Sequence, residues 1–312
     1  MSEPRFDATR FDGRVAVITG GARGLGRAYA NLLGSLGASV VINDNGSAIV
    51  GANDSGGTDA GPPEEAAAAI RAAGGKAVAD TNSVATFEGG TAIIQTALDA
   101  FGKVDILIHS AGNVRYGALD EIAEEDFRAV IDVHLMRAFN VVRPAFPHMV
   151  KAGYGRVVLT GSIGGIYGTR RIVNYAMSKA AMIGLSNVIA IEGAEHGIKS
   201  NLILPGAVTR MSEAVDTSKF PDMGPELVAP VVGYLAHESC AVSGEMYLSI
   251  AGRVARAFIS ETEGIYRPVW SIADIAANLD AIRDPAHAWS AATGQGYAEQ
   301  MTRSFAMARG EV

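Results

Sequence analysis

Short apolar segments rich in β-branched residues alternate with longer helical patterns along most of this chain, and this alternation is the strongest constraint on its fold. A segment at 15–19 is followed by a helical pattern at 27–36, and a segment at 39–43 by an alanine-rich helical pattern at 64–73. Continuously apolar strands are typical of a parallel sheet whose two faces are both buried. Right-handed crossovers place helices on both faces. The chain is therefore predicted to be an α/β protein with a doubly wound parallel sheet.

The same alternation of strand and helix patterns continues to residue 250. Further strands are expected at 76–79, 104–108, 156–160, 199–204 and 245–250, and further helices at 91–101, 124–149, 175–195 and 226–236. Pro144 and Pro147 are expected to bend the helix in which they lie, because proline lacks a backbone N–H. A Gly/Asp/Asn/Ser-rich stretch at 45–61 indicates a surface loop. We expect a single domain over 9–252, with residues 253–312 forming a helical C-terminal extension packed on it.

Composition narrows the function classes. A formal net charge of −7 and a pI near 5.4 argue against a nucleic-acid-binding surface. No stretch approaches the roughly 20 apolar residues that a membrane-spanning helix needs, and residues 1–14 lack an apolar signal region. The single cysteine, Cys240, suits a reducing compartment. These features predict a cytoplasmic protein without nucleic-acid or membrane partners.

A glycine-rich turn lies between the first expected strand and the first expected helix. Gly20, Gly24 and Gly26 would allow a tight turn and a close approach of the backbone to a pyrophosphate, which the unpaired N–H groups of the helix N-terminus would bind. A glycine-rich turn without a ligand remains the alternative. The residues of this turn expected to contact a dinucleotide are Gly20, Arg23, Gly24, Leu25 and Gly26.

Asp44 ends the second expected strand. A carboxylate at this place accepts hydrogen bonds from the adenine ribose hydroxyls and repels a 2′-phosphate, which favours NAD over NADP. Arg23 in the glycine turn points the other way, because it would pair with a 2′-phosphate. We give Asp44 more weight, because a carboxylate beside a phosphate dianion costs more than an exposed arginine gains. An ordinary strand-end turn residue is the alternative for Asp44.

Tyr175 and Lys179 stand four residues apart, so they share one face of an expected helix. An unperturbed tyrosine, with a pKa of about 10, is only ~0.1% ionised at pH 7, and a nearby fixed cation is expected to lower that pKa. Ser162 follows the fifth expected strand, at the carboxyl end of the sheet, where ligands of open α/β folds bind. The three residues are therefore candidate catalytic groups.

The Gly-x3-Gly-x-Gly turn and the spacing of Ser162, Tyr175 and Lys179 resemble the short-chain dehydrogenase/reductase family over about residues 9–252. The resemblance implies a Rossmann fold and hydride transfer between NAD(H) and an alcohol or ketone. By this resemblance, Tyr175 is the general acid/base. Lys179 lowers its pKa and holds the nicotinamide ribose, and Ser162 positions the substrate oxygen.

The chain departs from the family pattern at several positions. Where the family usually has Asn-Asn-Ala-Gly, this chain has His109-Ser110-Ala111-Gly112. His134 stands in place of the catalytic asparagine that the family has in the long helix. His134 is assigned to hold a proton-relay water, with helix packing as the equal alternative. Arg210 stands where a threonine is usual, and Asn82 replaces the aspartate that contacts adenine. Further cofactor contacts implied by the resemblance are Asn82, Ser83, Ser110, Ala111, Gly112, Pro205, Val208 and Thr209, besides Tyr175 and Lys179.

Three features resemble the (3R)-hydroxyacyl-CoA dehydrogenase unit of type 2 peroxisomal multifunctional enzymes and its bacterial relatives. They are the segments 133–135 and 231–240 and the arginine at position 210. The last residues, 310–312, are no peroxisomal targeting tripeptide, and no hydratase domain follows. A free-standing dehydrogenase is expected. Its substrate would be a small-molecule secondary alcohol or ketone, with hydroxyacyl thioesters and steroids both open.

The substrate pocket is expected to be lined by residues 114–116, 163–167 and 211–224. Four arginines near it would either meet an anionic substrate or be ordinary solvated charges: Arg115, Arg170, Arg171 and Arg210. No metal is expected. The resemblance implies a homodimer or homotetramer. The altered asparagine positions keep one alternative open, a catalytically silent NAD-binding regulatory or scaffold protein on the same fold.

Overall fold

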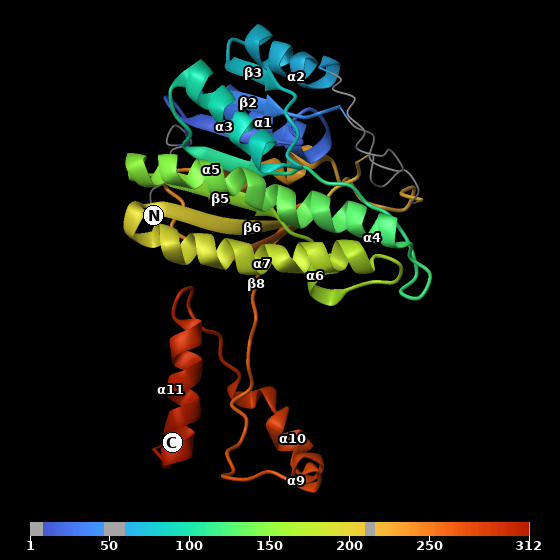
Figure 1. Ribbon diagram of the computed structural model, residues 1–312, viewed down its shortest axis with the longest axis vertical. Coiled ribbons are helices and arrows are strands. Elements are labelled where there is room, and N and C mark those ends of the chain that lie inside the picture. Colours follow the sequence, from blue (N-terminus) through green and yellow to red (C-terminus); the bar gives the residue numbers. More distant parts are fainter. Residues whose placement is uncertain (1–8, 47–59, 210–215, 312) are drawn as a thin grey trace. The chain divides into compact units, whose positions relative to one another are not determined.

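The computed structural model describes residues 9–46, 60–209 and 216–311 (Figure 1). The chain divides into two units, with the boundary between Arg256 and Ala257, and each is described by itself. None of the helices in these described ranges is long and apolar enough to cross a membrane.

The first unit is built on an eight-stranded sheet with the order β3-β2-β1-β4-β5-β6-β7-β8. Neighbouring strands from β3 to β7 all pair in parallel, which confirms the predicted doubly wound sheet. Thr19 at the end of β1 pairs with Asn43 of β2 and His109 of β4, so the carboxyl ends of these strands are level. The strands are β1 (Val15–Thr19), β2 (Ser39–Asn43), β3 (Lys76–Asp80), β4 (Ile106–His109), β5 (Gly155–Thr160), β6 (Ile198–Gly206), β7 (Met246–Ile250) and β8 (Arg253–Ala257).

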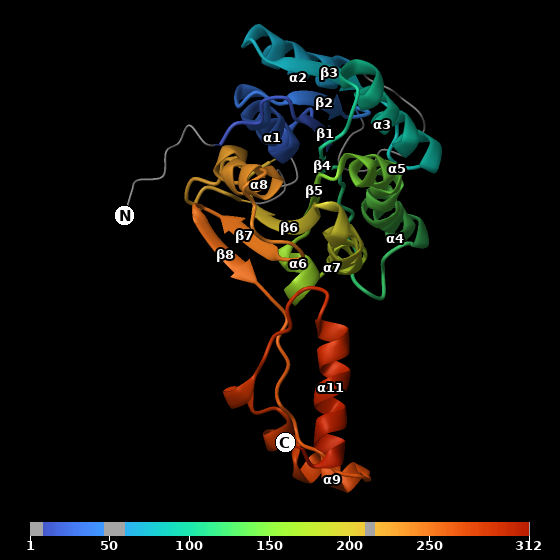
Figure 2. The ribbon, with the colours of Figure 1, turned by 90° about the vertical axis from the view of Figure 1, so that its left-hand side faces the viewer.

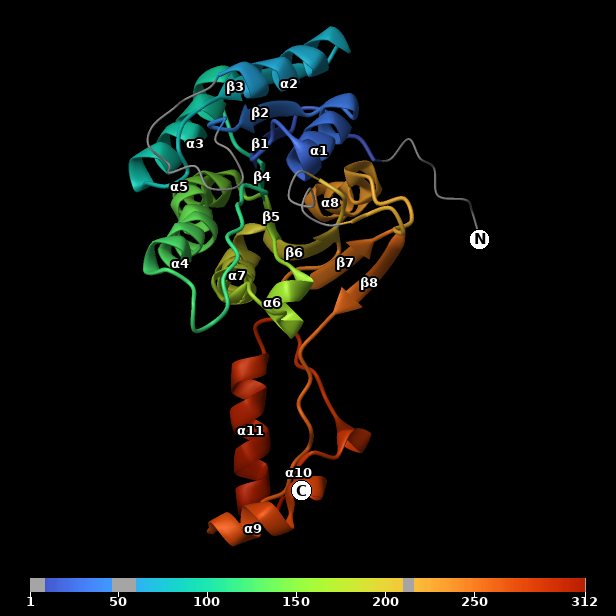
Figure 3. The ribbon, with the colours of Figure 1, turned by 90° about the vertical axis from the view of Figure 1, so that its right-hand side faces the viewer.

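Helices cover both faces of this sheet. The helical segments of the first unit are α1 (Gly24–Ser35), α2 (Gly61–Ala72), α3 (Phe87–Phe101), α4 (Glu124–Ile131), η2 (Asp132–Met136), α5 (Arg137–Ala152), α6 (Ile163–Tyr167), α7 (Val173–Gly193), η3 (Ala194–His196), η5 (Pro225–Leu227) and α8 (Ala229–Ala236). α1 and α8 lie on one face, and α3, α5 and α7 lie on the other (Figures 2 and 3). Fully buried Tyr29 and Leu33 of α1 pack with Ile18 and Ile108 of the strands and Val232 of α8. Burial of such side chains is the main stabilising term of the fold.

The predicted helix 124–149 is interrupted at residues 132–136. α5 continues through Pro144 and Pro147, whereas the five residues of η2 form a π-helical turn between α4 and α5. Such turns are often found at functional sites. The π-turn holds His134, so the interruption bears on the site described below.

The sheet continues by one strand beyond the predicted end of the domain at residue 252. β7 turns into β8 through Ala251 (φ 48°) and Gly252 (φ 78°), and two successive residues with positive φ are typical of a tight β-hairpin. The expectation that 245–250 is the last strand was therefore wrong. Residues 253–257 were assigned to the extension because strand and helix patterns are hard to distinguish in so short a segment.

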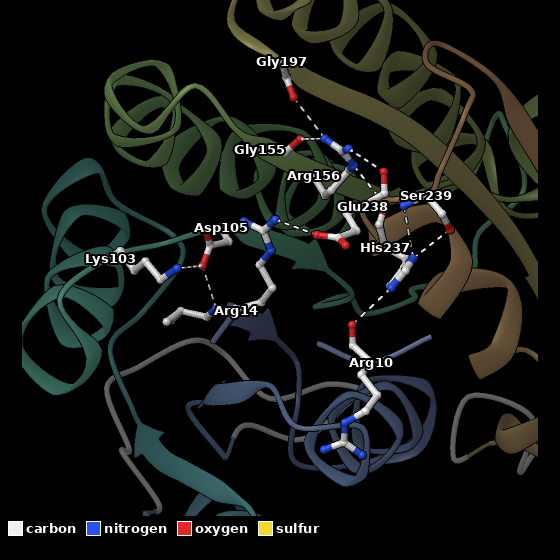
Figure 4. Close-up of polar contacts among 11 residues, drawn as sticks. Arg10, Arg14, Lys103, Asp105, Gly155, Arg156, Gly197, His237, Glu238 and Ser239 are labelled. Atoms are coloured by element: carbon white, nitrogen blue, oxygen red, sulfur yellow. Dashed lines mark hydrogen bonds and ion pairs between the residues drawn. The ribbon is translucent and has the colours of Figure 1, made fainter. Parts of the chain in front are cut away.

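Buried polar contacts close the amino edge of the sheet (Figure 4). Asp105, directly before β4, is 2% exposed and accepts a hydrogen bond of 2.8 Å from the N–H of Val15. Its carboxylate pairs with Lys103 at 3.0 Å and with Arg14 at 3.4 Å. These contacts fix the starts of β1 and β4 at the edge opposite to the glycine turn.

The second unit contains α9 (Ile272–Ala277), α10 (Leu279–Ile282), η6 (Pro285–His287) and α11 (Gly296–Arg309), so the extension does contain helices. Glu261 and Trp289 form an isolated antiparallel bridge. From α11, Gln300 donates to the Glu261 carboxylate at 2.7 Å, and the Arg303 guanidinium lies 4.2 Å from the Trp289 ring centroid. Packing of this unit on the first stays a prediction.

Candidate active site

The candidate site lies at the carboxyl edge of the sheet, where β1 is flanked by β2 on one side and β4 on the other. The chain leaves β1 through α1 for β2 on one side, and returns from β3 through α3 to β4 on the other side, so the strand order reverses at this point. Open α/β sheets bind their ligands at such a point. Four segments lie along this edge: the glycine turn after β1, the loop after β4, the start of α6 after β5, and the segment after β6.

The glycine turn leaves no space for side chains. Gly20 has a φ of 65°, and a Cβ there would lie 2.8 Å from the backbone N and Cα of Ala111. A Cβ on Gly26 would lie 2.1 Å from the Gly20 carbonyl oxygen. A Cβ on Gly24 would meet the side chain of Thr209 at 3.4 Å, so the segment after β6 reaches the turn. The structure thus brings together the predicted residues of the turn with Ala111 and Thr209.

The start of α1 has no side-chain cap. Arg23 occupies the N-cap position in an extended conformation and makes no capping hydrogen bond. The first N–H groups of a helix have no partner within the helix, and they carry a partial positive charge. Leu25, like Arg23, is only partly exposed. This end of α1 can therefore bind an anion.

The expected adenosine-contacting residues cluster beyond β2 and β3. Asp44 directly follows β2, and its Oδ1 accepts a hydrogen bond of 2.9 Å from the N–H of Gly46. Asn82 donates from Nδ2 to the Asp80 carboxylate at 2.8 Å, which fixes its amide. Ser83 accepts from the N–H of Ala85 at 3.2 Å. Asp44 and the two residues after β3 therefore lie at one end of neighbouring strands.

The other residues expected to contact the cofactor lie in the loop after β4 and in or after the last residues of β6. Ser110 donates its N–H to the Thr19 carbonyl at 3.1 Å, which ties the loop after β4 to the end of β1. A Cβ on Gly112 would lie 2.4 Å from His134 Cε1, so only glycine fits there. Pro205 lies in β6 and pairs with Ser249 of β7. Val208 is 37% exposed. Arg210 lies outside the described residues.

Ser162 and Tyr175 are brought into contact. Ser162 caps α6, and its Oγ accepts a hydrogen bond of 3.0 Å from the N–H of Gly164. The Ser162 hydroxyl also interacts with the Tyr175 phenol and favours its ionised form. A Cβ on Gly164 would lie 3.4 Å from Ser162 Oγ and 3.8 Å from the Tyr175 ring, so a small residue keeps the space beside both groups open.

Lys179 is 5% exposed, and its Nζ donates to the Thr160 carbonyl at 2.7 Å. The Nζ lies 5.6 Å from the centroid of the Tyr175 ring. Burial lowers the pKa of Lys179 to about 7. The trio predicted from spacing is thus gathered at one place.

The expected lowering of the Tyr175 pKa is not found. Burial raises this pKa, and the hydrogen bond from Ser162 only partly offsets the effect. The physical reason is that Lys179 is itself desolvated and donates to a carbonyl rather than to the phenol. In this structure the phenol is therefore a proton donor at neutral pH.

His134 projects from the π-turn and meets Tyr175 edge to face, with ring centroids 5.3 Å apart and an interplanar angle of 87°. Its Nε2 lies 2.6 Å from the carbonyl oxygen and 3.2 Å from the N–H nitrogen of Asn113. Burial lowers the pKa of His134 well below its usual value, and the Lys179 charge adds to this effect. His134 is a neutral ring packed against Tyr175.

Two positioning residues were missed at the sequence level. Asn174 accepts from the N–H of Tyr175 at 2.8 Å and donates to the Arg115 carbonyl at 3.2 Å. His109 is 2% exposed and its Nδ1 lies 2.8 Å from Thr19 Oγ1. An asparagine beside the tyrosine and a histidine ending a strand were the available signals, but their burial is visible only in the fold.

Three arginines expected near the substrate have definite environments. Arg115 forms an ion pair with Asp126, and Arg171 lies 3.7 Å from Glu121, which supports the reading of these two as ordinary charges. Arg170 is exposed.

Among the residues expected to line the substrate pocket, Tyr116 is 52% exposed. Residues 211–215 of the expected lining segment 211–224 are outside the described part of the chain. Among the described residues no cluster of His, Cys, Asp and Glu has the arrangement of a metal site.

Comparison with known proteins gives consistent matches. A sequence model of the family described as short chain dehydrogenase matches residues 14–219. Peroxisomal multifunctional enzyme type 2 of Drosophila melanogaster is 44% identical over 83% of this chain, which spans only 42% of that relative. A short-chain type dehydrogenase/reductase of Mycobacterium tuberculosis is 40% identical, over 87% of this chain and 94% of the relative. The crystal structure of a short chain dehydrogenase from Mycobacterium avium superposes with a TM-score of 0.74 at 33% identity, covering 87% of this chain and 94% of that chain.

Proposed function

This chain belongs to the short-chain dehydrogenase/reductase family, and we propose that it transfers a hydride between NAD(H) and a secondary alcohol or ketone. The observation that carries this proposal is the meeting of Ser162, Tyr175 and Lys179 at the carboxyl edge of the sheet that also carries the glycine turn. The relatives compared are named as enzymes, and nothing in them favours the catalytically silent alternative.

The residues present fit a dinucleotide. Side chains are excluded at Gly20 and Gly26, and α1 begins without a side-chain cap, so backbone N–H groups can approach a pyrophosphate. Asp44 supports NAD, because its carboxylate can accept from ribose hydroxyls and repels a 2′-phosphate. When bound, the nicotinamide supplies the hydride donor or acceptor.

The chain's own residues would supply proton transfer and orientation. Ser162 would hold the substrate oxygen beside the Tyr175 hydroxyl, with which the serine hydroxyl interacts. Tyr175 would give its proton to this oxygen during reduction and accept it back during oxidation. Lys179 would stabilise the tyrosinate and hold the nicotinamide ribose, and His134 would support the tyrosine ring from its edge.

For the substrate we propose a hydroxyacyl thioester or a steroid-sized alcohol. The support is the similarity to relatives named multifunctional enzymes and the exposure of Tyr116, Ile163 and Tyr167 near the site. We also propose a cytoplasmic homodimer or homotetramer. The cytoplasmic compartment is proposed from the sequence composition, whereas several relatives carry peroxisomal names.

The test is turnover by a Tyr175→Phe variant. Loss of the proton donor is expected to lower kcat by a factor of about 10²–10⁴, with NADH binding nearly unchanged. NAD⁺ and NADP⁺ reduction should be measured over panels of hydroxyacyl-CoA, steroid and small alcohols, and NADH binding by fluorescence.

Tyr297→Phe is the control, because Tyr297 is 86% exposed and lies on α11, outside the residues assigned to the site. It should keep wild-type kcat. Wild-type turnover in the Tyr175→Phe protein would reject the mechanism, and tight NADH binding without turnover of any alcohol would reject the enzymatic proposal.

A further inference from the structure

A network of buried polar groups joins the ends of β2 and β3 to α3, and its centre is Asp80. This residue ends β3 and is 5% exposed. A carboxylate is costly to bury unless hydrogen bonds compensate for the lost water. The Asp80 carboxylate has four such contacts, one each with Asn43 and Thr96 and two with Asn82. Asp80 has no part in the proton transfer proposed above, so these contacts indicate a different role.

One oxygen of Asp80 holds the backbone of Asn82. Asp80 Oδ1 accepts from the Asn82 N–H at 3.0 Å and from Asn43 Nδ2 at 2.7 Å. Asn43 Nδ2 also donates to the Asn82 carbonyl at 2.8 Å. The orientation of the Asn43 amide follows from these contacts, because both partners of its nitrogen are acceptors. The N–H and the carbonyl of Asn82 are thus both fixed.

The other oxygen of Asp80 determines which way the Asn82 side-chain amide faces. Asp80 Oδ2 accepts from Asn82 Nδ2 at 2.8 Å, and the Thr96 hydroxyl lies 2.6 Å from the same oxygen. The opposite orientation of the amide would place Asn82 Oδ1 against a carboxylate oxygen, and both of these atoms are acceptors. Asn82 is an exposed residue, so its amide oxygen faces away from the carboxylate and can accept from a ligand.

The order of the strands places this amide where the purine of a bound dinucleotide would lie. The glycine turn, Asp44 and Asn82 follow β1, β2 and β3, which are neighbours in the sheet. The N–H of Gly21 donates to the Asn43 carbonyl at 3.0 Å, and the N–H of Asp44 donates to the Asp80 carbonyl at 3.0 Å. A dinucleotide with its pyrophosphate at the turn and its ribose at Asp44 would therefore bring its purine to the end of β3.

We propose that Asp80 is a positioning residue that selects adenine over a 6-oxopurine by fixing the Asn82 amide. With its oxygen turned outward, this amide accepts a hydrogen bond from the 6-amino group of adenine. Hypoxanthine carries a carbonyl oxygen in the same place, so two acceptors would face each other there. The selection of the purine rests on the proposed use of NAD(H), whereas the orientation of the amide rests on the contacts above.

The test is the binding of two reduced dinucleotides to the full-length protein, measured by isothermal titration calorimetry. The wild type is expected to bind NADH about tenfold more tightly than reduced nicotinamide hypoxanthine dinucleotide. In Asp80→Asn, the introduced carboxamide keeps its oxygen toward the Asn43 amide and turns its NH₂ group to Asn82, whose amide then reverses. The preference for NADH should therefore disappear or invert.

Asp99→Asn is the matched control, because it makes the same change at an exposed position of α3 and should leave the preference as it is. A tenfold preference that persists in Asp80→Asn would overturn the proposal. Equal affinities of the wild type for the two dinucleotides would also overturn it.

A second variant separates positioning from packing. Asn82→Ala removes the amide at an exposed position and should bring the two affinities to within about twofold of each other. Adding Asp80→Asn to Asn82→Ala should not change their ratio further, because the carboxylate acts through that amide. A further change of the ratio in the double variant would contradict the proposed role of Asp80.

The Asn82 side chain also gives a readout that needs no dinucleotide. In ¹H–¹⁵N NMR of the wild type its NH₂ group should exchange slowly with solvent, and exchange should become faster in Asp80→Asn but not in Asp99→Asn. Fast exchange in the wild type would overturn the assigned orientation of the amide. If neither dinucleotide binds to the wild type, the proposed use of NAD(H) fails, while the NMR measurement still decides whether Asp80 positions Asn82.

Discussion

At the scale of single residues, the ionisation of the site is decided by burial rather than by the charge of Lys179 alone. Burial lowers the pKa of Lys179 to about 7 and raises that of Tyr175. The Tyr175 phenol is therefore neutral near pH 7, and about half of the Lys179 side chains beside it carry a charge. A neutral phenol can donate its proton, and ketone reduction requires a proton donor.

The pH dependence of ketone reduction follows from these directions. Below its pKa of about 7 Lys179 carries its charge and can stabilise the tyrosinate that forms, and above that pKa the charge is lost. We therefore expect kcat/KM for reduction to be level on the acid side and to fall as the pH rises through about 7. Initial rates from about pH 6 to about pH 9 test this. A Lys179→Ala variant should be slow and lack this limb, and an unchanged rate up to about pH 9 in the wild type would contradict the assignment.

Asp44 is the single residue on which the cofactor preference depends. Replacing Asp44 with Ala removes the ribose acceptor and the repulsion of a 2′-phosphate, so the ratio of kcat/KM for NAD⁺ over NADP⁺ should fall about 10- to 100-fold. Steady-state kinetics with both cofactors measure the ratio. Glu125→Ala, at an exposed acidic position of α4, is the control and should leave it unchanged. An unaltered ratio in the Asp44 variant would show that Asp44 does not determine the preference for NAD⁺ over NADP⁺. Arg23 would then be the next residue to test.

At the scale of elements, the two edges of the sheet differ in how they are covered. The carboxyl edge is kept open by glycines and by the helix start of α1, whereas the amino edge is closed by polar contacts (Figure 4). Arg156, at the start of β5, is 5% exposed, and its guanidinium is surrounded by backbone carbonyls instead of a carboxylate. These are the carbonyls of Gly155 at 2.7 Å, Gly197 at 3.0 Å, His237 at 3.1 Å and Glu238 at 3.2 Å.

We expect Arg156→Lys to destabilise the protein although the charge is conserved. An ammonium has three donors on one atom and cannot reach four carbonyls that surround a planar guanidinium. The expected loss in the free energy of unfolding is about 2–4 kcal/mol, measured by urea denaturation. Arg128→Lys, at a 70% exposed ion pair on α4, should change it by under about 0.5 kcal/mol. Equal stability of the two variants would show that the carbonyl contacts are not stabilising.

At the scale of the whole molecule, the second unit has no interior of its own. No described residue after Ala257 is buried, and large apolar side chains such as Ile272 (91% exposed), Tyr297 (86%) and Val269 (80%) face outward within this unit. A segment of this length without a core cannot offset its loss of chain entropy. We propose that it docks on the first unit, of its own chain or of a second copy.

Hydrogen exchange tests this docking. In the full-length protein the amides of α11 should exchange slowly, whereas an isolated peptide covering 257–312 should exchange at the rate of an unfolded chain. Light scattering at micromolar concentration should report a dimer or tetramer. Fast exchange of α11 in the intact protein would contradict docking, and a monomer would contradict the proposed assembly.

The amino-acid sequence by itself determined the strands β1 to β7, the glycine turn and the spacing of Ser162, Tyr175 and Lys179. It also determined the main helices between the strands, but not the short helix α6. All of these are local patterns, because side-chain periodicity and turn chemistry are set by neighbours along the chain. Family membership rests on the same local patterns, and the comparisons confirmed it.

Only the tertiary structure decided the direction of the Tyr175 pKa, the pairing of Arg115 with Asp126 and the place of His109 beneath the site. It also showed the π-turn at His134 and the additional strand β8. Burial and hydrogen-bond partners come from residues distant in sequence, so no local pattern contains them. Desolvation in particular depends on everything packed around a group, and here it outweighs the charge one helical turn away.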